Sequence, residues 1–83
     1  MSADIASIAN ALRAIVQNRD KKALNYAVNY AQYGLTMINT GSPKKDIRVQ
    51  LLYILNNITH WRGKEATIVR SVIKEAIHSW KGE

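Results

Sequence analysis

Apolar residues recur along the chain at intervals of three and four, the spacing that places them on one face of an α-helix. Four such stretches follow one another, at about residues 4–18, 20–38, 43–61 and 64–80. No stretch of useful length alternates apolar and polar residues as a half-buried strand would. The pattern predicts an all-α protein of about four helices. The predicted core comprises Ile5, Ile8, Leu12, Ile15, Val16, Leu24, Ala27, Val28, Ala31, Leu35, Ile38, Ile47, Leu51, Ile54, Leu55, Ile58, Trp61, Ala66, Val69, Val72, Ile73, Ala76, Ile77 and Trp80.

The ends of these stretches carry residues that start and stop helices. Ser2 or Asp4 can cap the first helix and Asp20 the second, because a side-chain oxygen accepts a hydrogen bond from a free amide of the first turn. The loop Asn39–Pro43 separates the second helix from the third. Its Gly41 suits a helix end, and its Ser42 can cap the next helix, with Pro43 at the first helical position.

Short connections between successive helices favour antiparallel neighbours, so we expect residues 1–83 to form one small up-down-up-down bundle. Gly63 is the expected left-handed stop of the third helix. That break is so short that the third and fourth helices could instead meet at a steep angle. Trp61 and Trp80 continue the core stripes of their helices, which predicts a place in or beside the core for both.

The second and third helices differ from the others in their lack of charge. No charged residue occurs between Ala23 and Pro43 or between Val49 and His60. The second helix carries a row of aromatic residues beside its core face, and a further tyrosine lies on the third helix. Depletion of charge with enrichment of Tyr and Met is typical of a protein interface. The candidate interface residues are Tyr26, Tyr30, Tyr33, Met37 and Tyr53.

Two interpretations of this uncharged helical hairpin compete. In one, the second helix is central in the bundle, and its tyrosines lie along a groove with their hydroxyl groups in water. In the other, the hairpin binds a partner, and a second copy of the chain is the simplest partner. We favour the homodimer, because a helix of a monomeric bundle should keep one charged face. Gly34, inside the second helix, indicates a close crossing with the Ala-rich first helix or with another subunit.

The chain carries a formal net charge of +6 and has a pI near 9.9, which favours an anionic partner such as nucleic acid or an acidic protein. Arg19, Lys21 and Lys22 at the first connection should lie near Arg62 and Lys64 at the third, because an up-down bundle brings these connections to one end. The alternative is that the cations only keep the surface solvated. The candidate phosphate contacts are Arg62, Lys64, Arg70, Lys74 and Lys81.

Candidate chemistry is sparse. The chain contains no cysteine, which fits a reducing compartment, and its first residues lack the basic start and continuous apolar run of a signal peptide, so we expect a cytoplasmic protein. Glu75 lies three residues before His78, but this is only half of a di-metal motif. His60 lies at the end of the predicted third helix, with no second histidine or carboxylate at metal-ligand spacing. The four glycines are isolated from one another, so the sequence contains no glycine-rich phosphate-binding loop. We expect no enzyme, cofactor or metal site. Amide side chains throughout Ala23–Pro43 argue against a membrane span.

The sequence therefore predicts a non-enzymatic interaction module that self-associates through its second and third helices. The alternative is a basic, nucleic-acid-associated accessory protein. Short, basic, cysteine-free helical chains of this general type are common among the accessory proteins of phages and other mobile elements.

Overall fold

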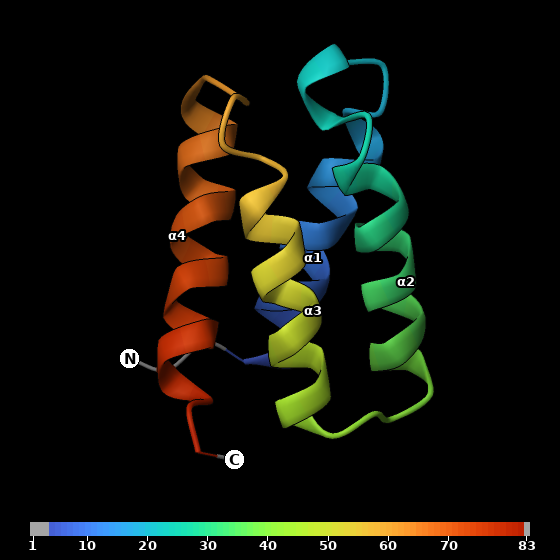
Figure 1. The fold of residues 1–83 in the computed structure, drawn as a ribbon, viewed down its shortest axis with the longest axis vertical. Coiled ribbons are helices and arrows are strands. Elements are labelled where there is room, and N and C mark those ends of the chain that lie inside the picture. Colours follow the sequence, from blue (N-terminus) through green and yellow to red (C-terminus); the bar gives the residue numbers. More distant parts are fainter. Residues whose placement is uncertain (1–3, 83) are drawn as a thin grey trace.

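The computed structural model describes residues 4–82, and this part of the chain folds into four α-helices (Figure 1). The helices are α1 (Ile5–Gln17), α2 (Ala27–Asn39), α3 (Lys44–Asn56) and α4 (Lys64–Ser79), with a short 3-10 helix, η1 (Lys22–Leu24), between α1 and α2. The predicted all-α class and the small helical bundle are confirmed.

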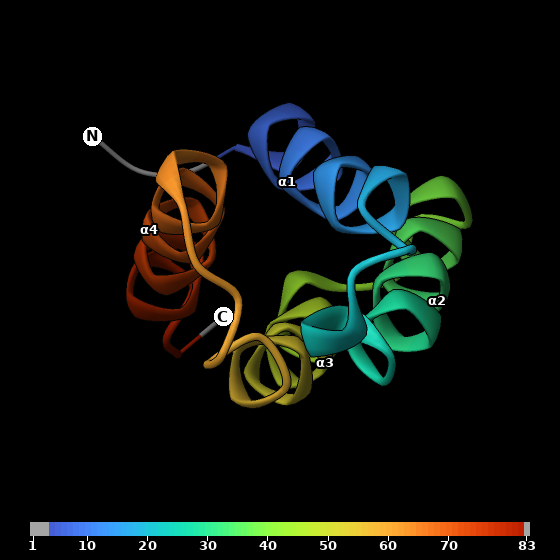
Figure 2. The same cartoon turned by 90° about the horizontal axis from the view of Figure 1, so that it is seen from above.

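Successive helices run antiparallel, and each packs mainly against two neighbours. α1 packs against α2 and α4, and α3 packs against the same two helices. The view down the bundle in Figure 2 shows this ring of four. The α1–α4 face and the α2–α3 face therefore lie on opposite sides of the molecule. α4 returns alongside α3, so the two helices do not meet at the steep angle that the sequence left open.

The bundle has two different ends. The α1–α2 and α3–α4 connections lie together at the upper end in Figure 1, and the α2–α3 connection lies at the lower end. In that lower connection Gly41, at a φ of 75°, ends α2 as expected. The amide of Gly41 donates to the carbonyl of Ile38, and the amide of Ser42 donates to the carbonyl of Met37. These two bonds form a Schellman motif. The prediction that Ser42 caps α3 is wrong, because Pro43 takes the N-cap position and no side chain caps the helix.

The second helix starts later than predicted. The prediction that Asp20 caps it is wrong, because the chain turns at this point and forms η1, and α2 begins only at Ala27. The amide of Lys21 donates to the carbonyl of Asn18 at 2.9 Å, which closes the turn.

The third helix ends at Asn56, five residues before the predicted end. The side-chain amide of Asn57 donates to the Tyr53 carbonyl at 2.7 Å, a local bond of the kind that competes with helix propagation. Ile58 and Trp61 are nevertheless buried as predicted, because turns with bonds between residues three apart keep them on the core side. Gly63, at a φ of 113°, therefore precedes α4 and does not stop α3.

The core is built from the predicted apolar stripes. Trp61 and Trp80 are each 2% exposed, which confirms their predicted place in the core. The predicted core residues that are only half-buried pack against the buried cluster from its margin, and they are Ile5, Val16, Val28, Leu35, Ile38, Leu55, Val72 and Ile77.

Gly34 marks a close crossing within the chain. A β-carbon at this position would lie 2.9 Å from Cδ1 of Leu12 in α1 and 3.7 Å from side-chain atoms of Gln50 and Ile54 in α3. The predicted crossing with the first helix is confirmed. Gly34 is buried in the bundle, away from any surface that a second subunit could reach.

Asp4 caps α1, as the sequence predicted; the other candidate, Ser2, lies outside the described residues. The amide of Ser7 donates to Oδ1 of Asp4 at 2.8 Å, and this bond lowers the pKa of the Asp4 carboxyl below its usual 3.8. A carboxyl with a lowered pKa in the folded state stabilises the fold above its unfolded pKa. That contribution is lost as the pH falls through the folded pKa.

We expect stability to fall as the pH drops below about 4, and part of this fall should vanish in Asp4→Asn. Asparagine also caps helices but does not titrate. Thermal unfolding followed by circular dichroism, from neutral to acidic pH, compares the two proteins. Parallel pH profiles would show that the Asp4 cap contributes nothing to acid sensitivity.

Candidate functional site

Large apolar side chains gather on the outside of α2 and α3. Among the described residues, six of the seven large apolar side chains that are exposed belong to this hairpin, and Ile68 on α4 is the seventh. Tyr26, just before α2, is 77% exposed and Tyr33 is 60% exposed. We call this surface the aromatic face; it consists of Tyr26, Tyr30, Tyr33, Val49, Leu52 and Tyr53.

The aromatic face joins two helices through a stacked pair of rings. The rings of Tyr30 on α2 and Tyr53 on α3 have their centroids 6.1 Å apart and their planes at 24°. Beside them Gln50, which is 8% exposed, donates from Nε2 to the Tyr30 carbonyl at 2.9 Å. The ring pair and this bond connect α2 to α3 at the centre of the aromatic face. The sequence gives no sign of the role of Gln50, since one glutamine on a helix carries no pairing information.

Four of the five candidate interface residues are exposed together on this face. The exception is Met37, which is half-buried and packs against the core from its margin. It lies one helical turn after Tyr33, near the end of α2.

Burial does not explain the lack of charge on α2. Its fully buried residues are the small Ala27, Ala31 and Gly34, and the half-buried Val28, Leu35, Met37 and Ile38 pack against the core beside them. The solvent side of α2 and of the residues just before it carries four uncharged polar residues. All four are exposed: Asn25, Asn29, Gln32 and Thr36. α2 thus has a normal solvent-facing surface without any charge, which is the property expected of a contact surface.

The upper end of the bundle gathers cations. Arg19, Lys21 and Lys22 lie on the α1–α2 connection, and Arg62 and Lys64 lie at the α3–α4 connection; all five are exposed. We call this surface the cationic end. It contains two carboxylates, Asp20 and Glu65, so its local formal charge is +3.

A hydrogen bond joins the two connections. Asn18 at the end of α1 donates from Nδ2 to Oε1 of Glu65 in the first turn of α4, at 2.9 Å. The same Nδ2 donates to the Ala14 carbonyl at 2.8 Å. This hydrogen bond therefore joins the end of α1 to the start of α4 at the cationic end.

The five candidate phosphate contacts are not brought together. Arg62 and Lys64 belong to the cationic end, Lys74 is exposed further down α4, and Lys81 follows α4 at the opposite end. Nη1 of Arg70 donates to the carbonyls of Ile58 and Trp61, at 3.1 and 2.6 Å. These bonds tie the α3–α4 connection to α4 and account for Arg70 without a phosphate.

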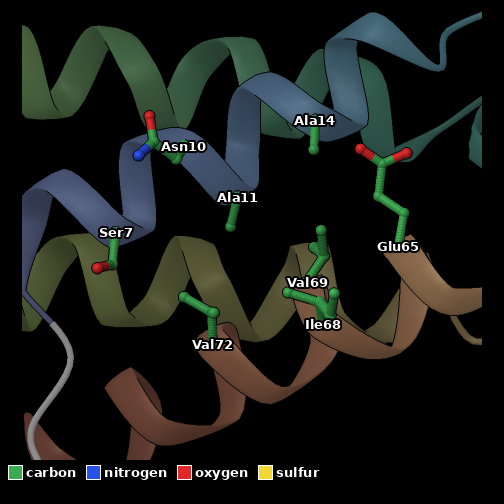
Figure 3. Close-up of a pocket in the computed structure, with 8 residues that line it drawn as sticks. All are labelled: Ser7, Asn10, Ala11, Ala14, Glu65, Ile68, Val69 and Val72. Carbon is green, nitrogen blue, oxygen red and sulfur yellow. The ribbon is translucent and has the colours of Figure 1, made fainter.

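A groove of about 350 Å³ lies between α1 and α4, on the side opposite the aromatic face (Figure 3). It forms where Ala11 and Ala14 are too short to fill the space above Ile68 and Val72. Its polar side chains are Ser7, Asn10 and Glu65, which offer no paired acid and base and no nucleophile next to a base. Its carboxylate, Glu65, is the acceptor of the Asn18 bond.

Residues 4–82 contain no group of three His, Asp or Glu side chains able to hold a metal ion. His60 and His78 are both exposed. None of the helices in this part of the chain is long and apolar enough to cross a membrane. Comparison with protein-family models, curated proteins and solved structures finds no match to the chain.

Proposed function

We propose that the protein is a non-enzymatic interaction module that self-associates through its aromatic face. The observation that carries the proposal is the concentration of exposed large apolar side chains on one side of the α2–α3 hairpin, which has no charged residue between Ala23 and Pro43 or between Val49 and His60. Single exposed apolar residues are common on soluble proteins, whereas a contiguous patch of them marks an interaction site. Tyrosine is enriched at interfaces because it supplies a large contact area with few rotatable bonds.

Charge favours a second copy of the chain as the partner. Two chains with a formal charge of +6 repel each other over most of their surfaces. The residues of the aromatic face carry no charge, so two copies can meet there without placing cation against cation. A two-fold axis through the aromatic face would set each row of tyrosines against the same row of the other copy.

The size of the face also suits a dimer. One whole side of a molecule that measures 33 × 25 × 19 Å spans roughly 600–800 Å², so the aromatic face together with the surface around it can approach the ~800 Å² that each partner buries in a standard interface. The chain has no cysteine, which fits a reducing compartment, and we propose that the protein acts in the cytoplasm.

Size-exclusion chromatography with light scattering, over a range of protein concentrations, tests the proposal. The wild type should reach a dimeric mass as concentration rises. Tyr30→Glu should weaken association by roughly 30-fold or more, because dimerisation would bury an unpaired carboxylate at a cost of about 2 kcal/mol. Ile68→Glu is the matched control, since it places the same charge on the opposite side of the bundle.

The control variant should keep the wild-type mass at every concentration. A wild type that stays monomeric at the highest concentration would reject the proposal. Equal weakening by Tyr30→Glu and Ile68→Glu would also reject it, because the effect would then come from charge alone.

A further inference from the structure

The structure divides the cations into two groups. Four of the twelve Lys and Arg side chains have partners within the fold. Arg13 donates to Oδ1 of Asn10 at 3.0 Å, Arg48 donates to the Ile77 carbonyl, and Arg70 donates to two carbonyls. The fourth, Lys44, lies 5.4 Å from the centroid of the Trp80 ring. The other eight are exposed, and no residue from 4 to 82 makes a hydrogen bond or ion pair with their side chains.

Five of those eight form the cationic end: Arg19, Lys21, Lys22, Arg62 and Lys64. Of the remaining three, Lys45 and Lys81 lie at the lower end of the bundle, and Lys74 lies between the ends on α4. Charges that only keep a protein in solution need no such concentration at one end. Cations without partners in the fold are also the ones whose side chains can move to meet a ligand.

The cationic end is displayed on a rigid base. The Asn18–Glu65 bond fixes its two connections to each other, and the Arg70 bonds fix the connection that carries Arg62. The end is built from connections and the first turn of α4, as the upper part of Figure 1 shows. It therefore presents exposed cationic side chains on connections that hydrogen bonds join to the bundle.

We propose that the cationic end binds the phosphate backbone of nucleic acid without reading its sequence. The bundle is 19–25 Å across, and double-stranded DNA carries one charge per ~1.7 Å of its axis, so the end can face several phosphates at once. Arg19 and Arg62 can each hold a phosphate through two parallel hydrogen bonds. This end consists of turns, the single turn of η1 and the start of α4, so it offers no α-helix lying sideways to fill a major groove and read bases.

An anionic membrane is the less suitable partner. Stable binding to a membrane surface needs buried apolar area in addition to charge. The exposed residues between Arg19 and Asn25 and between Thr59 and Lys64 are charged, polar or small. Tyr26 is the nearest large exposed ring, and it belongs to the aromatic face. The inference does not rest on self-association, although a dimer would carry two cationic ends.

Fluorescence anisotropy with a labelled, mixed-sequence DNA duplex tests the inference. Non-specific contacts of this kind give a Kd of roughly 10⁻⁴–10⁻⁶ M at physiological salt, so the titration begins at about 50 mM. Up to five phosphate contacts predict a slope of log K against log salt of about −4.5. The affinity should therefore fall by roughly 10²–10³-fold between about 50 and 200 mM.

Two charge-reversal pairs locate the binding surface. Lys21→Glu with Lys22→Glu should weaken binding by roughly 30- to 100-fold and make the slope shallower by about 2 units. Lys45→Glu with Lys81→Glu makes the same change in net charge at the other end of a molecule 33 Å long. That distance exceeds the Debye length of about 10 Å at 0.1 M salt, so the control pair should change the affinity by less than about 5-fold.

Three outcomes would overturn the inference: no binding by the wild type at the lowest salt, equal weakening by the two pairs, or binding to phosphatidylserine vesicles but not to the duplex. The last outcome would assign the cationic end to a membrane. All four substituted positions are exposed, and circular dichroism checks that both variants fold. Light scattering on the same samples separates this inference from self-association, because none of the four substituted residues belongs to the aromatic face.

Discussion

Replacing Leu12 with alanine is expected to lower the free energy of unfolding by about 2–5 kcal/mol. Leu12 is completely buried on α1 and lies against the point where Gly34 brings α2 close. Alanine removes its branched end and leaves a cavity that close-packed neighbours fill only in part. A domain of this size has a free energy of unfolding of only about 5–15 kcal/mol, so the loss is a large share. Urea unfolding at one fixed protein concentration measures it.

The loss should be partly recovered by a second change, Gly34→Ala. Alone, this change places a β-carbon 2.9 Å from Cδ1 of Leu12 and forces a buried side chain to shift. The strain of about 1–3 kcal/mol offsets the gain of about 1 kcal/mol in helix propensity. In the Leu12→Ala protein the obstacle is gone, so the same methyl group should stabilise the fold by about 1 kcal/mol.

The two changes are thus expected to couple by about 1–3 kcal/mol in a double-mutant cycle. Thr36→Ala supplies the control, because Thr36 is exposed on the same helix and its effect should be equal in both backgrounds. If Gly34→Ala stabilises both proteins equally, the contact between Leu12 and position 34 does not limit the packing.

The sequence predicts some helix ends well and others poorly. Both ends of α1 and of α4 lie within one residue of the prediction, because all the apolar residues used to predict each of them belong to the helix itself or to the residue that follows it. The second and third helices are shorter than predicted, since Leu24, Ile58 and Trp61 keep a helical spacing while they lie in turns. Apolar spacing reports which side of the chain is buried, and a chain of turns can preserve that spacing without a continuous α-helix.

The features of the candidate surfaces also differ in how well the sequence predicts them. The row formed by Tyr26, Tyr30 and Tyr33 could be predicted because one helix determines it. The stacking of Tyr30 on Tyr53, the Gln50 bond and the partners of Arg70 could not be, because they depend on how two elements meet. Up-down connectivity alone predicted that the five cations of the cationic end would lie together.

The contacts of Arg70 change the role that the sequence predicts for it. On the sequence it is one of the candidate phosphate contacts, but its guanidinium donates to the carbonyls of Ile58 and Trp61, whose side chains are buried. Arg70→Met is expected to lower the free energy of unfolding by about 2–4 kcal/mol, because two carbonyls lose a charged donor. For a domain of this size the melting temperature should fall by roughly 10 °C or more.

Lys74→Met is the control for Arg70→Met, since it removes the same charge from the same helix at an exposed position. It should change the free energy of unfolding by no more than about 0.5 kcal/mol. A structural Arg70 also predicts that the folded Arg70→Met protein loses no more affinity for a DNA duplex than the Lys74→Met protein. A large loss of DNA affinity with little loss of stability would contradict this assignment and return Arg70 to the phosphate contacts. The melting curve and the anisotropy titration therefore decide between the two roles.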